Sequence, residues 1–158
     1  MLYIVVYNVS SVQRIVDIAR FILTFTKKNE VPVVVFSRIS GSAAQTGIAE
    51  VSKLAYKLGR SILITENLED TLEIIKPSKA YVLSTNGVPI GEVIKESLEN
   101  NVAVILPGTE SAFSKYDLSL ATEFKVENLS EENGIVPLVT IVLYKIISEI
   151  RSKQKSIS

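Results

Sequence analysis

Strand-like and helix-like segments alternate along almost the whole chain, and this alternation limits the possible folds more than any single motif. Short runs rich in Val and Ile, such as residues 2–7 and 102–106, are apolar throughout. The segments between such runs repeat apolar residues every three or four positions, as amphipathic helices do. Strands that are apolar on both faces occur in parallel sheets whose two sides are covered by helices. The pattern therefore predicts an α/β fold, a single-domain parallel sheet covered by helices on both faces.

The boundaries of these segments follow from the apolar runs and from the Pro and Gly residues between them. The expected strands are residues 2–7, 31–36, 61–65, 80–84, 102–106 and 123–126. The expected helices are residues 11–25, 44–58, 68–75, 89–99 and 137–153. With 158 residues the chain fits one domain, residues 1–158, in which the tail at 151–158 is expected to be flexible.

Ligands of parallel sheets bind beyond the carboxyl ends of the strands, near the point where the strand order reverses. The loops to search are therefore residues 8–11, 37–47, 85–88 and 107–115. The second of these loops has two interpretations. Arg38 and the small residues around it can cradle a phosphate at the start of the next helix, or Ser42 can simply cap that helix.

The composition excludes several kinds of chemistry. The chain has neither Cys nor His, so disulfides, thiolate metal sites, Cys nucleophiles and histidine general bases are all excluded. Lys and Arg together number 17, as do Asp and Glu, so an RNA partner would have to be held by a local patch. The N-terminus lacks a basic signal-peptide region, and no apolar run is long enough to span a bilayer. We therefore expect a soluble, cytoplasmic protein with no membrane partner.

The final expected helix is apolar around most of its circumference. Its apolar residues are Leu138, Val139, Ile141, Val142, Leu143, Tyr144, Ile146 and Ile147. A single face packed on the sheet cannot bury all of them. The simplest second partner is another copy of the chain, which predicts a homodimer through the C-terminal helix. The alternative is a helix that is buried centrally within one chain.

Three short motifs occur in a recognisable order. Asn8 and Arg14 lie at the entry to the first helix, Gly108 and Glu110 follow the fifth expected strand, and residues 133–138 lead into the final helix. Neither a GxxxxGKS/T loop nor a GxGxxG fingerprint is present, so the usual backbone cradles for nucleotides are missing. In this order the motifs resemble the SPOUT class of RNA methyltransferases, and specifically its SpoU-like branch. The chain is most similar to a small archaeal SpoU-like group of uncertain function, some of whose members are also labelled RecB-family nucleases.

The resemblance implies a fold, a cofactor and a set of site residues. The C-terminal half would form a trefoil knot that binds S-adenosylmethionine, and the final helix would lie in a homodimer interface. The implied activity is methylation of RNA, with the ribose 2′-hydroxyl as the target, and Arg14 and Asn8 would be the catalytic residues. The residues implied to bind the cofactor are Ser84, Thr85, Asn86, Gly87, Leu106, Pro107, Gly108, Glu110, Leu129, Ile135 and Leu138. No metal site is expected.

Two departures from the SpoU-like pattern leave other functions open. Phe113 stands where the second motif of the class ends in Gly, and residues 134–137 replace the polar residues that enter the final helix in active enzymes. The chain could therefore be a catalytically inactive SPOUT-like dimer that binds a ligand or RNA. A second alternative is a metal-dependent nuclease, because Asp117, Glu123 and Lys125 occur in an order that can hold Mg²⁺. Alternation along a strand also explains the latter two as outward-facing residues.

The motif residues also have simpler structural explanations. Asn8 can cap the first helix, and Arg14 can pair with Asp17 one turn further on. Gly108 can serve only as a turn residue, and Glu110 can stabilise the start of a following helix through its dipole. What favours a functional site is that these residues occur in the expected order on the expected elements.

Overall fold

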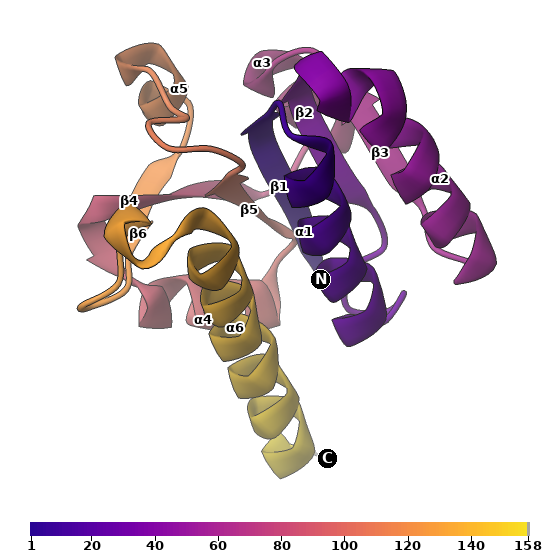
Figure 1. Ribbon diagram of the computed structural model, residues 1–158. Helices are drawn as coiled ribbons and strands as arrows, with labels where there is room; N and C mark the ends of the chain where they lie inside the picture. Colours follow the sequence, from indigo (N-terminus) through magenta and orange to yellow (C-terminus); the bar gives the residue numbers. More distant parts are fainter. Residues whose placement is uncertain (158) are drawn as a thin grey trace.

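A computed structural model describes residues 1–157 and contains a parallel sheet in the order β3-β2-β1-β5-β4-β6 (Figure 1). Its strands are β1 (Leu2–Val9), β2 (Val34–Ile39), β3 (Ile62–Thr65), β4 (Lys79–Pro89), β5 (Val102–Pro107) and β6 (Thr122–Lys125). Every pair of neighbouring strands is parallel. The strand order reverses between β1 and β5, so this is the point where the fold favours a ligand site.

Helices cover both faces of the sheet. They are α1 (Val12–Phe25), the π-helical turn η1 (Ala43–Gly47), α2 (Ile48–Lys57), α3 (Leu68–Ile75), α4 (Ile90–Glu99), α5 (Lys115–Ser119), the 3₁₀ turn η2 (Glu131–Asn133) and α6 (Ile135–Ile157). The larger core lies between the sheet and α1, α2, α4 and α6, whereas a smaller core lies under α3 and α5. The predicted fold class is therefore confirmed.

The elements that differ from the prediction, or were not predicted, are short or irregular. The expected helix at residues 44–58 begins instead as the π turn η1, where Gly47 packs against Ile15 of α1. The expected strand at residues 31–36 is shifted to Val34–Ile39. The helix α5 was not expected at all, although Ser114 and Asp117 form a capping box at its start. A capping box satisfies free N–H groups at both ends of the first turn, so it allows a helix of a single turn to form here.

The C-terminal helix differs from the expectation at both ends. It begins at Ile135 and continues to Ile157, so the tail expected to be flexible is helical up to that residue, while Ser158 lies outside the described residues. Most of its apolar circumference is buried against α1, α4 and β5 of the same chain. Of the apolar residues singled out in the sequence, only Ile141 and Tyr144 are exposed, at 48% and 59%. Central burial thus accounts for most of this surface, and the homodimer stays a prediction.

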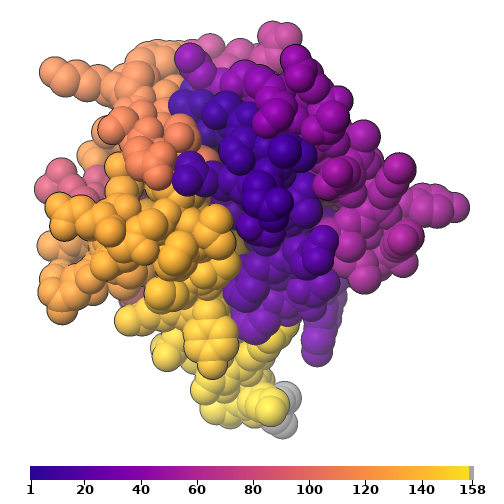
Figure 2. Space-filling model, viewed as in Figure 1, coloured from indigo at the N-terminus to yellow at the C-terminus, as the bar shows by residue number. Residues whose placement is uncertain are grey.

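The helices α1 and α6 lie side by side on one face of the molecule (Figure 2). Phe21, Phe25 and Tyr144 form a row of stacked rings between them, with centroids 5.1 and 5.6 Å apart.

No helix within residues 1–157 is long and apolar enough to cross a membrane.

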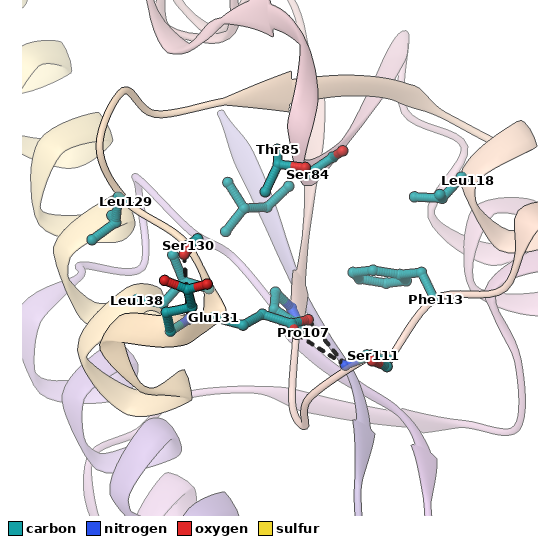
Figure 3. A pocket seen from close by; sticks show the side chains of 13 residues that line it. Ser84, Thr85, Pro107, Ser111, Phe113, Leu118, Leu129, Ser130, Glu131 and Leu138 are labelled. Atoms are coloured by element: carbon teal, nitrogen blue, oxygen red, sulfur yellow. Dashed lines mark hydrogen bonds between the residues drawn. The ribbon is translucent and has the colours of Figure 1, made fainter.

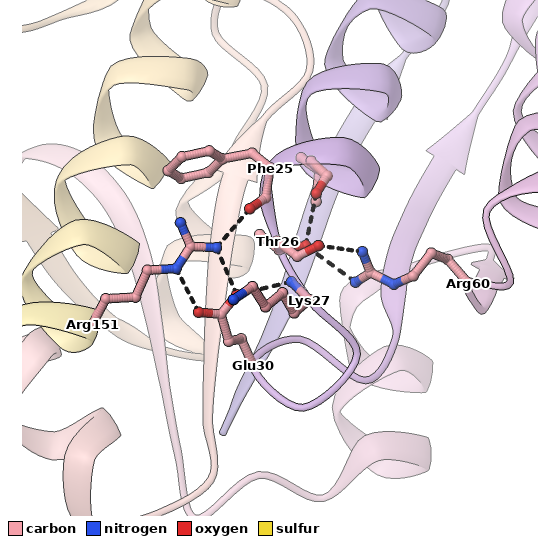
Figure 4. Close-up of polar contacts among 7 residues, drawn as sticks. Phe25, Thr26, Lys27, Glu30, Arg60 and Arg151 are labelled. Carbon is pink, nitrogen blue, oxygen red and sulfur yellow. Dashed lines mark hydrogen bonds and ion pairs between the residues drawn. The ribbon is translucent and has the colours of Figure 1, made fainter. Parts of the chain in front are cut away.

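An ion pair fastens the end of α6 to the rest of the fold (Figure 4). Arg151 Nε donates to Glu30 Oε2 at 2.6 Å, and a terminal nitrogen of the same guanidinium donates to the Phe25 carbonyl oxygen at 2.7 Å. Burial favours the neutral form of Glu30, but hydrogen bonds from Arg151 and from the Lys27 N–H outweigh it, so the pKa of Glu30 is lowered. The carboxylate is therefore a stabilising group in the folded state.

This lowered pKa predicts how the stability of the fold depends on pH. The contribution of Glu30 is complete above the pKa of an unfolded glutamate, about 4.3, and is lost as the pH falls through the lower folded pKa. We expect Glu30→Gln to reduce the free energy of unfolding at pH 7 by about 1–3 kcal/mol, and the difference from wild type to shrink below about pH 4. Urea denaturation at pH 7, 5, 4 and 3 measures this. The exposed Glu73→Gln is the control, and a Glu30 deficit that stays constant with pH would contradict the prediction.

Candidate functional site

A cavity of about 380 Å³ opens at the carboxyl ends of β4 and β5, beside the point where the strand order reverses (Figure 3). Its walls come from the end of β4, the loop after β5, α5, and the segment that leads into α6. The lining residues are Leu83, Ser84, Thr85, Pro107, Ser111, Ala112, Phe113, Leu118, Leu129, Ser130, Glu131, Glu132 and Leu138. Both its position and its volume are typical of a small-molecule site.

One wall of the cavity is an aromatic ring held by a buried tyrosine. The rings of Phe113 and Tyr7 are stacked, with centroids 5.5 Å apart. The Tyr7 hydroxyl donates to Asp117 Oδ1 at 3.3 Å, and the other oxygen of that carboxylate accepts the Ser114 N–H at 2.9 Å. Burial, only partly offset by Arg38, raises the pKa of Tyr7. The phenol therefore remains a donor at neutral pH. Its hydrogen bond to Asp117 holds the Tyr7 ring, against which Phe113 stacks at the cavity wall.

The opposite side of the cavity is polar and negatively charged. The carboxylate of Glu131 accepts the Ser111 N–H with both oxygens, at 3.0 and 3.2 Å. Glu132 adds a second carboxylate, and the described lining residues include no Lys or Arg. A cavity with this charge disfavours phosphate-bearing ligands and favours neutral or cationic ones.

The first sequence motif lies next to the cavity and holds the loop that forms its wall. Arg14 makes two contacts with the Glu110 carboxylate, at 3.3 and 3.4 Å. A hydrogen bond from its own backbone N–H and a second from Arg14 lower the pKa of Glu110. Asn8, at a left-handed φ of 70°, donates from its side chain to the Ala112 carbonyl oxygen at 3.2 Å. Asn8 and Arg14, although distant in sequence from this loop, therefore anchor it at two points, Ala112 and Glu110.

The simpler explanations offered for these two residues are wrong. The cap of α1 is Ser11, whose hydroxyl accepts the Arg14 N–H, and not Asn8. Asp17 accepts a hydrogen bond from Gln13 and not from Arg14. Ser42 does not cap the helix that follows it with its side chain, because its hydroxyl accepts the Val12 N–H and so fastens the 37–47 loop to the start of α1.

Gly108 allows the loop after β5 to pass close to β1. Its N–H donates to the Tyr7 carbonyl oxygen at 2.7 Å. A Cβ atom at this position would overlap the Val9 side chain and lie 3.0 Å from the carbonyl oxygens of Tyr7 and Asn8. The residue is more than a turn, since only glycine fits this approach.

The structure divides the residues that were predicted to bind the cofactor into two groups. Those that line the cavity are Ser84, Thr85, Pro107, Leu129 and Leu138. Those that do not are Asn86, Gly87, Leu106, Gly108, Glu110 and Ile135. Leu106 and Ile135 are buried in the larger core, at 0% and 1% exposure, and Glu110 is engaged by Arg14.

Several lining residues were not among the individual residues predicted to bind the cofactor, chiefly Ser111, Phe113, Leu118 and the run 130–132, although Ser111 and Phe113 lie in the predicted loop at residues 107–115. Most belong to or flank the short elements α5 and η2. Both elements begin with a serine whose side chain accepts a backbone N–H in a capping box. Those Ser-x-x-Asp and Ser-x-x-Asn spacings are the one signal in the sequence that could have located these elements.

The three residues of the nuclease alternative are engaged in contacts that support the fold. Asp117 is bound by Tyr7 and Ser114, while Glu123 accepts the Ser84 hydroxyl at 2.7 Å. Lys125 pairs with Glu127 at 3.5 Å. Within residues 1–157, no group of three or more acidic side chains is close enough together to hold a metal ion.

Comparison with solved structures identifies the class of fold. The structure described as "Structural insights into the 2-OH methylation of C/U34 on tRNA" superposes with a TM-score of 0.73 at 13% identity, covering 96% of this chain and 97% of that one. The SpoU methyltransferase AviRb from Streptomyces viridochromogenes, in complex with AdoMet, gives a TM-score of 0.70 at 9% identity over 96% of this chain and 61% of that one. The chain therefore has the fold of the SPOUT methyltransferases, as the sequence motifs predicted.

Sequence comparison then identifies the family. The chain belongs to the family described as RecB-family nuclease (DUF2122), whose model matches residues 41–145. It is 27% identical to "Putative type II restriction enzyme MjaORF1200P" of Methanocaldococcus jannaschii over 94% of this chain and 98% of that protein. It is 30% identical to "Putative type II restriction enzyme ApeKORF2002P" of Aeropyrum pernix over 89% of this chain and 88% of that protein. The structural neighbours are thus described by methylation, whereas the two sequence relatives carry the names of restriction enzymes.

Proposed function

We propose that this protein binds S-adenosylmethionine in the cavity and methylates a ribose 2′-hydroxyl of RNA. The observation that carries the proposal is the position of the cavity: it lies where the strand order reverses, and the loop that walls it is held by Arg14 and Asn8. The superposed structure whose description concerns 2-OH methylation on tRNA supports the choice of reaction. The AviRb structure, solved in complex with AdoMet, supports the choice of cofactor.

The cavity suits the cofactor in size and in the chemistry of its walls. Leu129, Leu138 and the ring of Phe113 offer apolar surface for the adenine, and Thr85 offers a hydroxyl at the rim. The carboxylates on the opposite wall suit a ligand that carries positive charge. When bound, S-adenosylmethionine supplies an electrophilic methyl group. The residues of the chain would hold the ligand and keep water from it.

Arg14 is the residue placed to receive the RNA. Its side chain is 29% exposed, and the Glu110 carboxylate that it contacts is 57% exposed, so both are accessible from outside the cavity. A guanidinium can bind a phosphate with two parallel hydrogen bonds. We propose that an RNA phosphate replaces Glu110 on Arg14 and so brings a ribose hydroxyl to the mouth of the cavity. Methyl transfer depends mainly on such positioning and on removal of the hydroxyl proton.

A catalytically inactive binding protein is the second candidate. The entry to α6 favours it, because Gly134, at a φ of 94°, is followed by the buried Ile135 and by Pro137. This entry therefore offers no polar side chain to a substrate. In either case we propose a homodimer through α6, where Ile141 and Tyr144 remain exposed, and a knotted C-terminal segment around the cavity.

Calorimetric titration with S-adenosylmethionine and S-adenosylhomocysteine tests the cofactor site. We expect micromolar binding, and we expect Leu129→Arg, which fills the cavity with a charged chain, to weaken it at least about tenfold. The matched control is Leu58→Arg, at the exposed leucine that caps the C-terminal end of α2. Thermal unfolding verifies that both variants fold. If neither ligand binds at millimolar concentration, the cofactor proposal is wrong.

Transfer of a labelled methyl group to total RNA separates the two candidates. Label in the RNA fraction, located at 2′-O positions by nuclease digestion, is expected for the enzyme. Cofactor binding without any transfer would favour the inactive binding protein.

A further inference from the structure

The acidic wall of the cavity is built by a single turn of helix. The turn η2 begins at Ser130, whose hydroxyl accepts the Glu132 N–H, while the Asn133 side chain accepts the Ser130 N–H. This capping fixes the turn, from which Glu131 projects toward the cavity (Figure 3), and Glu132 lines the cavity as well. The charged groups on the cavity wall are therefore both negative and both come from one rigid segment.

Glu131 is held at the cavity without neutralisation of its charge. Its carboxylate spans from η2 to the loop after β5, where both oxygens accept the Ser111 N–H. A backbone N–H fixes the position of a carboxylate but supplies no full positive charge. The nearby guanidinium of Arg14 is paired with Glu110, and no ion pair to Glu131 occurs within the described part of the chain. A fixed, unpaired negative charge on a cavity wall attracts a cationic ligand.

We infer that Glu131 makes the cavity selective for the positively charged cofactor over its neutral product. This inference rests on the proposed function. The sulfur of S-adenosylmethionine carries a positive charge, whereas that of S-adenosylhomocysteine is neutral, and the remaining ionisable groups of the two ligands are identical. The attraction of Glu131 for the amino group shared by both therefore cancels in the ratio of their affinities. Only the interaction with the sulfur remains, which favours entry of the cofactor and release of the product.

The conservative substitution for the test is Glu131→Gln. Its amide oxygen can still accept the Ser111 N–H, and the side chain keeps its length, so the substitution removes mainly the charge. Glu99→Gln removes an equal charge at an exposed position at the end of α4, and so controls for the overall field of the protein. Glu132→Gln tests whether the effect belongs to Glu131 or to the wall as a whole.

The measurement is the ratio of dissociation constants of the two ligands, determined by calorimetry for each variant. We expect wild type and Glu99→Gln to favour S-adenosylmethionine by about tenfold, the ratio that a single charge contact of this kind gives. Glu131→Gln should bring the ratio close to one by weakening S-adenosylmethionine alone, and Glu132→Gln should change it less. Sinefungin, which carries an ammonium group near the position of the sulfur, should follow S-adenosylmethionine in all variants.

Several outcomes would overturn the inference. Equal affinities in wild type, or a Glu131→Gln variant that weakens both ligands alike, would show that Glu131 does not discriminate between the two sulfurs. An equal effect of Glu132→Gln would assign the selectivity to the acidic wall as a whole and not to Glu131. These outcomes leave the cofactor site intact. Absence of binding by either ligand in wild type would instead refute the proposed function, and the inference with it.

Discussion

Gly87→Ala should lower the free energy of unfolding by about 3 kcal/mol or more, although it adds one methyl group at an exposed position of β4. Gly87 has a φ of 98°, a conformation that L side chains rarely adopt. A Cβ atom there would overlap the backbone carbonyl of Glu123 on the neighbouring strand β6. Backbone in a paired strand cannot move aside as a flexible side chain can. The substitution should therefore disrupt the irregular pairing between β4 and β6, which shifts register between Leu83 and Val88.

Gly91→Ala is the matched control for this prediction. Gly91 lies in α4, and nothing lies within 4 Å of where its Cβ would be. Alanine is a better helix former than glycine, so we expect this variant to gain up to about 1 kcal/mol. Urea denaturation at neutral pH measures both variants. Similar stabilities for the two would refute the structural role assigned to Gly87, and a stable Gly87→Ala protein with lost cofactor affinity would restore its predicted role in binding.

Gly87 illustrates what the sequence does and does not predict about this fold. The loop expected at residues 85–88 contains the Asn-Gly pair at 86–87, and these residue types favour turns. The sequence could not indicate that the chain pairs again with β6 beyond the irregularity, so β4 runs to Pro89 rather than ending at Ser84. By contrast, the helix at residues 68–75 was predicted with its observed boundaries. Its cap at Asn67 and the proline that follows its end are local signals, and local signals are what a sequence shows directly.

The candidate site also divides into features that local signals predict and features that depend on contacts between distant segments. The loops after the fourth and fifth strands were predicted from the general location of ligand sites in parallel sheets, and five of the predicted residues line the cavity. Neighbouring residues of a strand point to opposite faces, so Leu106 and Pro107 could not both face the cavity, and Pro107 is the one that does. The contact of Arg14 with Glu110 joins residues 96 positions apart. No local pattern reveals such a contact, and only the order of the motifs suggested that the two segments meet.

Arg14→Ala should lower the rate of RNA methylation by about 100-fold or more while leaving the affinity for S-adenosylmethionine unchanged. Arg14 does not line the cavity, and the loop that it contacts is also held by Asn8 and Glu131, so its loss should affect the RNA and not the cofactor. Arg14→Lys should not restore the rate, because an ammonium group cannot make the two parallel hydrogen bonds of a guanidinium. Single-turnover methylation rates and calorimetry separate the two effects. Arg20→Ala, at an exposed arginine of the same helix, is the control.

Glu110→Gln decides whether the Arg14 pair is part of this function or only fastens the loop. If RNA phosphate competes with Glu110 for Arg14, removal of the negative charge should strengthen RNA binding several-fold. It should also make RNA binding more sensitive to salt, because Arg14 then meets the phosphate directly. If the pair only fastens the loop, both Arg14→Ala and Glu110→Gln should weaken cofactor binding to a similar extent, since Ser111 and Phe113 would lose their fixed positions in the cavity wall. The two roles thus predict different results for Glu110→Gln, stronger RNA binding in the first case and weaker cofactor binding in the second. The double variant should behave like Arg14→Ala alone if the competition with RNA is real.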